Sequence, residues 1–255
     1  MADQTRAVQG RNGFAGKPPV AGMGQCYYTL TVTIAGEPDN VGGYLVNIKH
    51  IDDAVRDLVV PHVKDVVRGG CQGNARGGGG VVLDAWDKLQ HAFTPHQLAT
   101  VTLALSPYTR LTTDSDLAPK QMLRLTHTFE FAASHRLHND QLSEDENHKL
   151  FGKCNNPHGH GHNYVVEVTI VGTPDKNGHL SSIDDLERIV DERVISPLDH
   201  KHLNVEVEEF KTLNPSVENI AKVCFDRLEG SLDGKLDSVR VWETPKTWCE
   251  YRRDD

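Results

Sequence analysis

The sequence of 255 residues lacks any apolar run that approaches the ~20 residues needed to cross a bilayer. Its first ten residues, Met1–Gly10, also lack the apolar core of a secretory signal peptide. These two absences argue against both a membrane protein and a secreted protein.

Paired cysteines and an excess of basic residues are missing as well. The five cysteines are widely spaced, include no Cys-x-x-Cys pair and are odd in number, which favours reduced thiols in the cytoplasm over a disulfide framework. With 27 Lys and Arg against 36 Asp and Glu, the net charge is −9. This balance argues against a nucleic-acid-binding protein, which needs a concentrated basic face. It leaves room for a local basic pocket that binds a small anion such as a triphosphate.

The sequence does contain an internal repeat. Tyr28–Gly36 and Tyr164–Gly172 are β-branched segments that match without a gap at an offset of 136 residues, and each is followed by a turn containing Pro and Asp. The likeness continues through an amphipathic helix, a second helical run and a closing strand. These matching elements are the helical patterns at Ile48–Val55 and Ile183–Val190, the runs that begin at Thr94-Pro95 and Asn214-Pro215, and the strands Arg110–Thr113 and Val241–Thr244.

The repeat predicts an α+β fold made of two tandem copies of a small domain. We expect residues 1–20 to form a flexible tail, residues 21–122 the first copy and residues 123–255 the second, which has an additional strand at Thr126–Ala133. The glycine-rich stretch Gly69–Gly80 is expected to be a flexible insertion in the first copy. It lacks the Gly-Lys-Ser/Thr ending of a phosphate-binding loop.

The second half of the sequence is rich in histidine, above all in the segment that precedes the repeated strand. There, His160 and His162 are separated by a single glycine. On an extended backbone their imidazoles lie on one face, which suits a tetrahedral zinc site with a fourth position open to substrate. The third ligand is either His135, at the end of the preceding predicted strand, or His158.

Cys154 has two possible roles beside these histidines: a fourth ligand in a closed structural site, or a catalytic thiol next to an open one. Asp199-His200 offers a base with an orienting carboxylate, a pair that lowers the pKa of a thiol. A histidine at the C-terminal turn of a helix also complements the helix dipole, which is the alternative role for this pair. Glu243 lies in an apolar strand, where a half-buried carboxylate usually has a partner, and Glu218 fits the acidic first turn of a helix.

Five segments between residues 126 and 251 resemble the 6-pyruvoyltetrahydropterin synthase family and occur in that family's order. They are FAASHRL at Phe131–Leu137, CNNPHGHGHNY at Cys154–Tyr164, LDHKHLN at Leu198–Asn204, NPSVENIA at Asn214–Ala221 and VWET at Val241–Thr244. The resemblance implies the tunnelling fold, or T-fold, in which each copy is an antiparallel sheet with two helices packed on one face. It also implies a homo-oligomer whose sheets join edge to edge into a β-barrel ring.

The chemistry follows from the same resemblance. The implied site residues are the zinc ligands His135, His160 and His162, the catalytic group Cys154, Asp199 and His200, and the pterin-binding residues Glu243 and Glu218. The family's substrate is 7,8-dihydroneopterin triphosphate, from which triphosphate is eliminated to form 6-pyruvoyltetrahydropterin. We therefore expect a cytoplasmic, zinc-dependent carbon–oxygen lyase of tetrahydrobiopterin biosynthesis that binds neither nucleic acid nor a membrane.

Two other functions remain open at this point. A sibling branch of the family forms 6-carboxytetrahydropterin for queuosine synthesis and has the spacing Cys-x3-His-Gly-His, which Cys154 and His158 satisfy. The pyruvoyl branch has Cys-x5-His-Gly-His, which Cys154 and His160 satisfy, and the surrounding residues favour that branch. The alternative from another class is a non-catalytic pterin- or zinc-binding protein with a closed site. No His-Glu-x-x-His motif indicates a zinc hydrolase.

The first copy lacks the equivalent residues. Gly24 and Cys26 stand opposite the two zinc-binding histidines of the second repeated strand, and Thr112 stands opposite Glu243. We therefore predict that the N-terminal copy holds no zinc and is catalytically silent. Its expected role is architectural, because an added sheet can cover an exposed strand edge.

Overall fold

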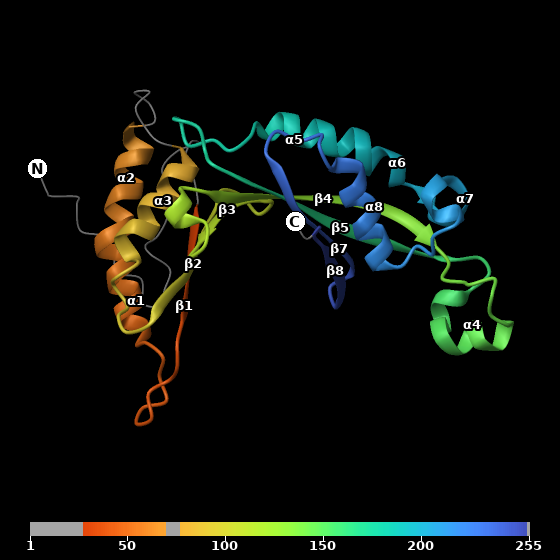
Figure 1. Ribbon diagram of the computed structural model, residues 1–255, viewed down its shortest axis with the longest axis horizontal. Coiled ribbons are helices and arrows are strands. Elements are labelled where there is room, and N and C mark those ends of the chain that lie inside the picture. The colour runs from red at the N-terminus through yellow and green to blue at the C-terminus, as the bar shows by residue number, and fades with distance from the viewer. Residues whose placement is uncertain (1–27, 70–76, 254–255) are drawn as a thin grey trace, which may run out of the picture. The chain divides into compact units, whose positions relative to one another are not determined.

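The computed structural model describes residues 28–69 and 77–253, and the chain divides into two compact units (Figure 1). The first unit comprises residues 1–123 and 173–179, and the second comprises residues 124–172 and 180–255. The division lies next to the expected boundary between residues 122 and 123, but Thr173–His179 group with the first unit. The expected flexible tail, residues 1–20, lies outside the described residues.

The N-terminal unit is a three-stranded antiparallel sheet with helices packed against it. Its elements are β1 (Thr29–Ala35), α1 (Ile48–Ala54), the π-helical segment η1 (Val55–Val59), α2 (Val60–Gly69), α3 (Gly78–Leu89), β2 (Gln97–Ala104), β3 (Thr109–Asp114) and a 3₁₀ turn, η3 (Ala118–Lys120). The sheet order is β1-β2-β3. Helix α3 packs on β2 and β3 and buries Val82, Trp86 and Leu89.

The position of the second helix in this unit corrects the sequence analysis. The helix expected to begin at Thr94-Pro95 is absent there among the described residues; those two residues instead precede strand β2. The second helix is α3, and its first turn is formed by Gly78–Gly80, the end of the stretch expected to be a flexible insertion. A Cβ on Gly79 would lie 2.5 Å from the carbonyl oxygen of Gly178, so a residue with a side chain would not fit there. Residues 70–76 of the same stretch lie outside the described residues.

The C-terminal unit contains the longer strands. Its elements are β4 (Leu123–His135), α4 (Glu144–Phe151), a 3₁₀ turn, η4 (Gly152–Asn155), β5 (His160–Gly172), α5 (Ile183–Val190), the π-helical segment η5 (Asp191–Ile195), α6 (Ser196–Leu198), β6 (Lys201–His202), α7 (Leu203–Glu206), a second 3₁₀ turn, η6 (Glu208–Lys211), α8 (Val217–Leu228), β7 (Lys235–Thr244) and β8 (Thr247–Tyr251). The sheet order is β4-β5-β7-β8, and the short β6 pairs parallel to β4. Strands β5, β7 and β8 are antiparallel, which confirms the predicted antiparallel α+β class.

Helices α5, α6 and α8 cover one side of this sheet (Figure 1). Alternate residues of β5 point into the core, and Val166, Val168 and Ile170 are fully buried. The covering helices contribute apolar residues at helical spacing, and Ser182 and Ser216 cap α5 and α8 as the sequence predicts. Their buried residues include Leu186, Val190, Val194 and Leu198 of the α5–η5–α6 run and Ile220, Cys224 and Leu228 of α8. This core holds the strand ends of the second unit in place.

The two units share three local irregularities at the same spacing. The β1–β2 register shifts between Thr33 and Ile34, and the β5–β7 register shifts between Thr169 and Ile170. Asp39 and Asp175 each accept main-chain N–H groups in the turn that follows, which lowers the pKa of each carboxyl group. The π-helical segments η1 and η5 then begin at Val55 and Asp191. Each feature therefore recurs at the offset of 136 residues found in the sequence.

The strand register also corrects one residue match between the halves. Thr29 pairs with Ala104 in the first unit, and Val165 pairs with Trp242 in the second. Strand β2 is therefore the counterpart of β7, and Leu105, rather than Thr112, falls at the place of Glu243. The earlier match was wrong because it assumed a helix after Thr94-Pro95, which displaced the strands that follow.

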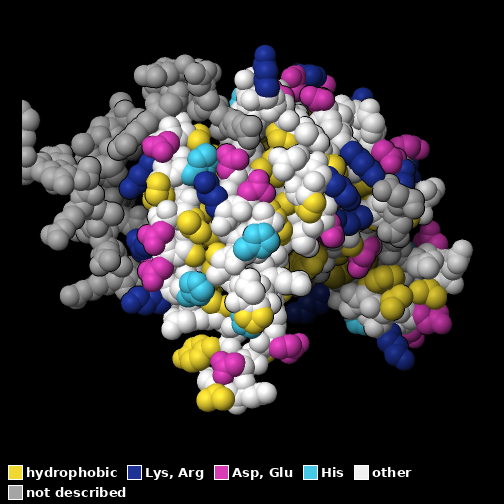
Figure 2. Space-filling view, turned by 60° about the vertical axis from the view of Figure 1, so that its left-hand side comes forward, with side chains coloured by type: hydrophobic (Ala, Val, Ile, Leu, Met, Phe, Trp, Pro, Cys, Tyr) yellow, Lys and Arg dark blue, Asp and Glu magenta, His cyan; other side chains and the backbone are white. Residues whose placement is uncertain are grey.

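The surface offers no sign of a large one-sided binding face. On the face shown in Figure 2, Lys and Arg, Asp and Glu, and hydrophobic side chains are interspersed over the described residues. Among the helices of residues 28–69 and 77–253, none has the length and apolar character required to span a membrane.

Candidate metal centre and active site

Three histidines and one glutamate converge at one end of the C-terminal sheet. His135 is the last residue of β4, His160 and His162 open the neighbouring strand β5, and Glu243 lies near the end of β7, which pairs with β5. One ligand atom from each residue lies within 4.8 Å of the others. The ring centroids of His135 are 4.6 Å from His160 and 5.2 Å from His162. The strand ends therefore bring together the three histidines named from the sequence, and Glu243 with them.

A main-chain carbonyl determines which nitrogen of His135 faces this cluster. His135 is fully buried, and its Nδ1 lies 2.7 Å from the carbonyl oxygen of Pro215, which only accepts hydrogen bonds. Nδ1 therefore carries the proton, and Nε2 presents a lone pair. This Nε2 lies 3.2 Å from Nε2 of His160 and 3.2 Å from Oε1 of Glu243. Pro215, which directly precedes helix α8, thus orients the ring towards the cluster.

The electrostatics of the cluster suit a divalent metal ion. Burial lowers the pKa of both His160 and His162, which favours the neutral imidazole that binds metals. The hydrogen bond with His135 lowers the pKa of Glu243, which favours its carboxylate. The buried Nε2 of His162 makes no hydrogen bond within the described part of the chain, although Oε1 of Glu243 lies 3.5 Å away. Three imidazole nitrogens and one carboxylate oxygen form a donor set that zinc accepts.

An open pocket of about 820 Å³ adjoins this cluster. His162 and Glu243 belong to its wall, together with polar and charged side chains of β4, β5 and the segment around β6. The other polar residues of the wall are Ser134, Asn163, His200, Lys201, His202, Glu206 and Thr244. A pocket of this size accommodates a small organic ligand, and the cluster would contact that ligand from one side.

Cys154 lies in the turn η4, before β5, and its thiol is not activated by the residues around it in this chain. Burial, and then the nearby carboxylate of Glu243, raise the pKa of Cys154. The Asp199–His200 pair sits between α6 and β6, where Oδ2 of Asp199 lies 2.7 Å from Nδ1 of His200. The His200 side chain is 83% exposed, and within the described residues neither member of the pair forms a hydrogen bond with Cys154. The sequence therefore identified both groups, but one copy of the chain does not join them.

The raised pKa of Cys154 gives a direct prediction for alkylation. Because the protonated thiol does not react, alkylation of metal-free protein by iodoacetamide should be slow at pH 7. The rate should rise with a midpoint above the ordinary thiol value of about 8.5. Mass spectrometry of the Cys154 peptide after timed alkylation between pH 6 and 10 measures this midpoint. A midpoint below 8.5 would contradict the stated effect of burial and of Glu243.

The remaining candidates lie away from the cluster. Glu218 is in the first turn of α8, where its charge raises the pKa of Cys249, and His158 is exposed before β5. Tyr164 was missed as a site residue: it is fully buried, its ring lies 5.6 Å from that of His162, and its hydroxyl has no hydrogen-bond partner among the described residues. The spacing of His160, His162 and Tyr164 along one strand face was the available signal for it.

Comparisons with known proteins match the half of the chain that carries this site. A family model described as 6-pyruvoyl tetrahydropterin synthase matches residues 124–254. The 6-pyruvoyl tetrahydrobiopterin synthase of Homo sapiens is 42% identical over 131 residues, which are 51% of this chain and 90% of the human protein. A putative 6-carboxy-5,6,7,8-tetrahydropterin synthase of Archaeoglobus fulgidus is 40% identical over 107 residues, covering 42% of this chain and 82% of that protein. The solved structure of Caenorhabditis elegans 6-pyruvoyl tetrahydropterin synthase is 36% identical with a TM-score of 0.50, over 52% of this chain and 96% of its own. The chain therefore belongs to the 6-pyruvoyl tetrahydropterin synthase family.

Proposed function

We propose that this protein is a zinc-dependent lyase that converts 7,8-dihydroneopterin triphosphate to 6-pyruvoyltetrahydropterin with release of triphosphate. The observation that carries the proposal is the cluster of His135, His160, His162 and Glu243 beside an open pocket of about 820 Å³. The names of the human and nematode relatives support the same reaction class. An open site next to a pocket favours catalysis over a closed structural zinc site.

Each predicted site residue has a role in this proposal. The three histidines hold the metal, and zinc bound there polarises the hydroxyl groups of the substrate and acidifies the adjacent C–H bonds. The Cys154 thiolate removes a proton from carbon, and the bond to triphosphate breaks with its electron pair leaving on the triphosphate oxygen. Glu243 accepts hydrogen bonds from the N–H groups of the pterin ring, and Glu218 supports that end of the site.

The Asp199–His200 pair activates Cys154 across two copies of the chain in this proposal. Its exposed imidazole is accessible to a second molecule, and Asp199 fixes the ring by a 2.7 Å contact at Nδ1. Activation from another copy accounts for the raised pKa of Cys154 in a single chain. The active protein is then a homo-oligomer, assembled as a β-barrel ring.

We also infer that the N-terminal unit is a degenerate second T-fold copy. The recurrence of a register shift, an Asp-centred turn and a π-helical segment at one offset supports duplication. Leu105 at the place of Glu243 supports a copy without catalytic residues. Its role is architectural, within the ring of sheets.

The 6-carboxy product remains the second candidate, because Cys154 and His158 also satisfy that branch's spacing and the archaeal relative carries that name. His158 is exposed, whereas His160 belongs to the metal cluster, which favours the pyruvoyl spacing.

The test is to incubate the purified protein with zinc and 7,8-dihydroneopterin triphosphate and to identify the products by mass spectrometry. We expect release of triphosphate and formation of 6-pyruvoyltetrahydropterin, and both should stop when the metal is removed by a chelator. A 6-carboxy product together with acetaldehyde would assign the protein to the sibling branch. Absence of triphosphate release at saturating zinc would refute the lyase.

A further inference from the structure

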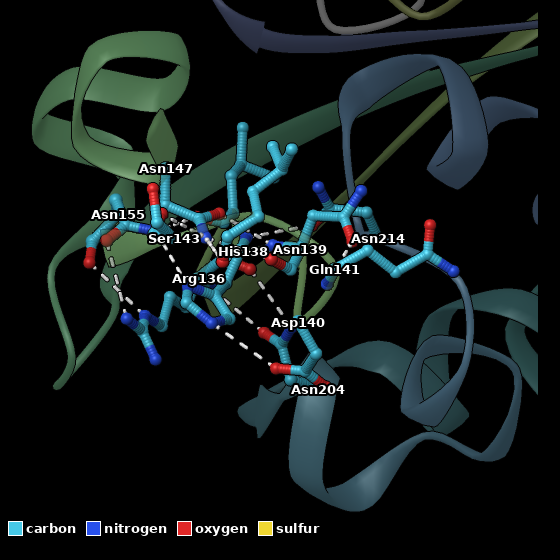
Figure 3. Close-up of polar contacts among 12 residues, drawn as sticks. Arg136, His138, Asn139, Asp140, Gln141, Ser143, Asn147, Asn155, Asn204 and Asn214 are labelled. Atoms are coloured by element: carbon cyan, nitrogen blue, oxygen red, sulfur yellow. Dashed lines mark hydrogen bonds and ion pairs between the residues drawn. The ribbon is translucent and has the colours of Figure 1, made fainter. Parts of the chain in front are cut away.

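A network of asparagine side chains joins the segment after His135 to the segment that contains Cys154. Figure 3 shows this network around Arg136 and His138, which follow the last residue of β4. The main-chain N–H of Leu137 donates to the carbonyl oxygen of Cys154 at 2.9 Å. Directly after Cys154, the side chain of Asn155 is only 6% exposed and lies against the same segment.

The orientation of the Asn155 amide is fixed by its neighbours. Its Nδ2 donates to the carbonyl oxygen of Leu137 at 2.8 Å, and its Oδ1 accepts from Nη2 of Arg136 at 3.4 Å. A carbonyl oxygen only accepts and a guanidinium only donates, so the amide has one allowed orientation. Nδ2 also lies 3.0 Å from Nδ1 of His138, which therefore acts as an acceptor while the opposite nitrogen, Nε2, lies 3.3 Å from Asp140. Asn155 thus bridges three consecutive residues of the other segment.

Arg136 is held from a second direction, by the segment that follows Asp199 and His200. The Asn204 side chain accepts from the main-chain N–H of Arg136 at 2.8 Å and donates to its carbonyl oxygen at 3.0 Å. Nε of Arg136 in turn donates to the carbonyl oxygen of Asn155 at 3.2 Å. The residue next to His135 is therefore fixed between the Cys154 turn and the segment of Asn204.

We propose that Asn155 is a positioning residue that fixes the Cys154 thiol relative to the metal ligand His135. This inference rests on the proposed function, in which Cys154 is the base and His135 holds zinc. The Cys154 turn is short and part exposed, and β5 begins only at His160, so the sheet does not constrain the turn directly. The hydrogen bonds of Asn155 supply that constraint, and a displacement of about 1 Å in a reacting group costs up to about 10²-fold in rate.

The test compares Asn155→Ala and Asn155→Asp with Asn147→Ala in the full chain. Asn147 is a matched control, because it is also buried and its amide donates to main-chain carbonyls, but these belong to Asn139, Leu142 and Ser143, away from Cys154. Asn155→Asp keeps the shape and the acceptor for Arg136 and removes both donors, so it serves if the alanine variant fails to fold. We expect both Asn155 variants to lower kcat by about 10–100-fold with little change in KM. Iodoacetamide should also alkylate Cys154 faster in these metal-free variants at pH 9.

Asn147→Ala should lower the Tm but leave kcat and the alkylation rate of Cys154 near the wild-type values. The positioning role is overturned if the Asn155 variants keep wild-type kcat and alkylation rates, or if Asn147→Ala loses as much kcat for the same loss of Tm. The alkylation comparison needs no substrate, so it separates this inference from the proposed function. If the wild-type protein releases no triphosphate, the lyase proposal fails; equal alkylation rates in wild type and Asn155→Ala would then overturn the positioning role as well.

Discussion

Replacing His160 with alanine is expected to remove tight zinc binding and to lower triphosphate release by about 10³-fold or more. Nε2 of His160 lies 3.2 Å from Nε2 of His135, so the variant leaves two imidazoles and one carboxylate around the site. Changes to partners outside the coordination shell already cost about 10–100-fold in metal affinity, and loss of a ligand should cost more. The metal supplies several kcal/mol of charge stabilisation, and 1.36 kcal/mol corresponds to tenfold in rate.

His158→Ala is the matched control for this prediction. It removes an exposed imidazole two residues earlier in the same Gly-His repeat, outside the group of four. Zinc affinity is measured by competition with a chelator, and activity by triphosphate release. The visible spectrum of cobalt-substituted protein reports the coordination geometry, and a thiolate-to-cobalt band would reveal Cys154 as a ligand of a closed site. Equal zinc affinity in His160→Ala and His158→Ala would contradict the metal centre.

The metal cluster shows how far local sequence patterns reach. Alternation along one strand was enough to place His160 and His162 on one face, because side-chain direction in a strand has a period of two. His135 was one of two candidates from the residues alone, and pairing of β4 with β5 is what brings its ring to 4.6 Å from that of His160. The participation of Glu243 depends on the register of β5 with β7. No short-range pattern specifies a pairing between strands so far apart in the sequence.

The fold was predictable where caps and periodicity agreed, and unpredictable where tertiary packing decided. Helices α5 and α8 begin after the serine caps expected for them. Helix α3 was missed because glycine is a poor helix former, yet its first turn needs Gly79, where a Cβ would meet the carbonyl oxygen of Gly178. The π-helical segments η1 and η5 also have no separate sequence signal, since they continue the apolar pattern of the helices that precede them.

Replacing Glu243 with glutamine is expected to lower kcat/KM by about 10²-fold while zinc affinity stays close to wild type. The structure permits two roles for this carboxylate, because Oε1 lies 3.2 Å from Nε2 of His135 while the residue also forms part of the pocket wall. In the proposed role it accepts hydrogen bonds from the pterin ring. Glutamine keeps the shape and one acceptor, but it removes the charge and presents an NH₂ group to ring donors. The loss of hydrogen bonds to a charged group, about 1.5–3 kcal/mol, corresponds to about 10–150-fold.

A ligand role for Glu243 makes the opposite forecast. Because glutamine is a weaker zinc ligand than a carboxylate, the variant would then lose zinc affinity, as His160→Ala is expected to do, and activity would recover at high zinc concentration. The two roles are separated by measuring chelator competition and kcat/KM on the same preparation, with zinc varied from limiting to saturating. Activity that stays low at saturating zinc indicates the pterin contact, whereas recovery to the wild-type value indicates the metal. The lowered pKa of Glu243 keeps it ionised at neutral pH, so the substitution removes a full negative charge in either case.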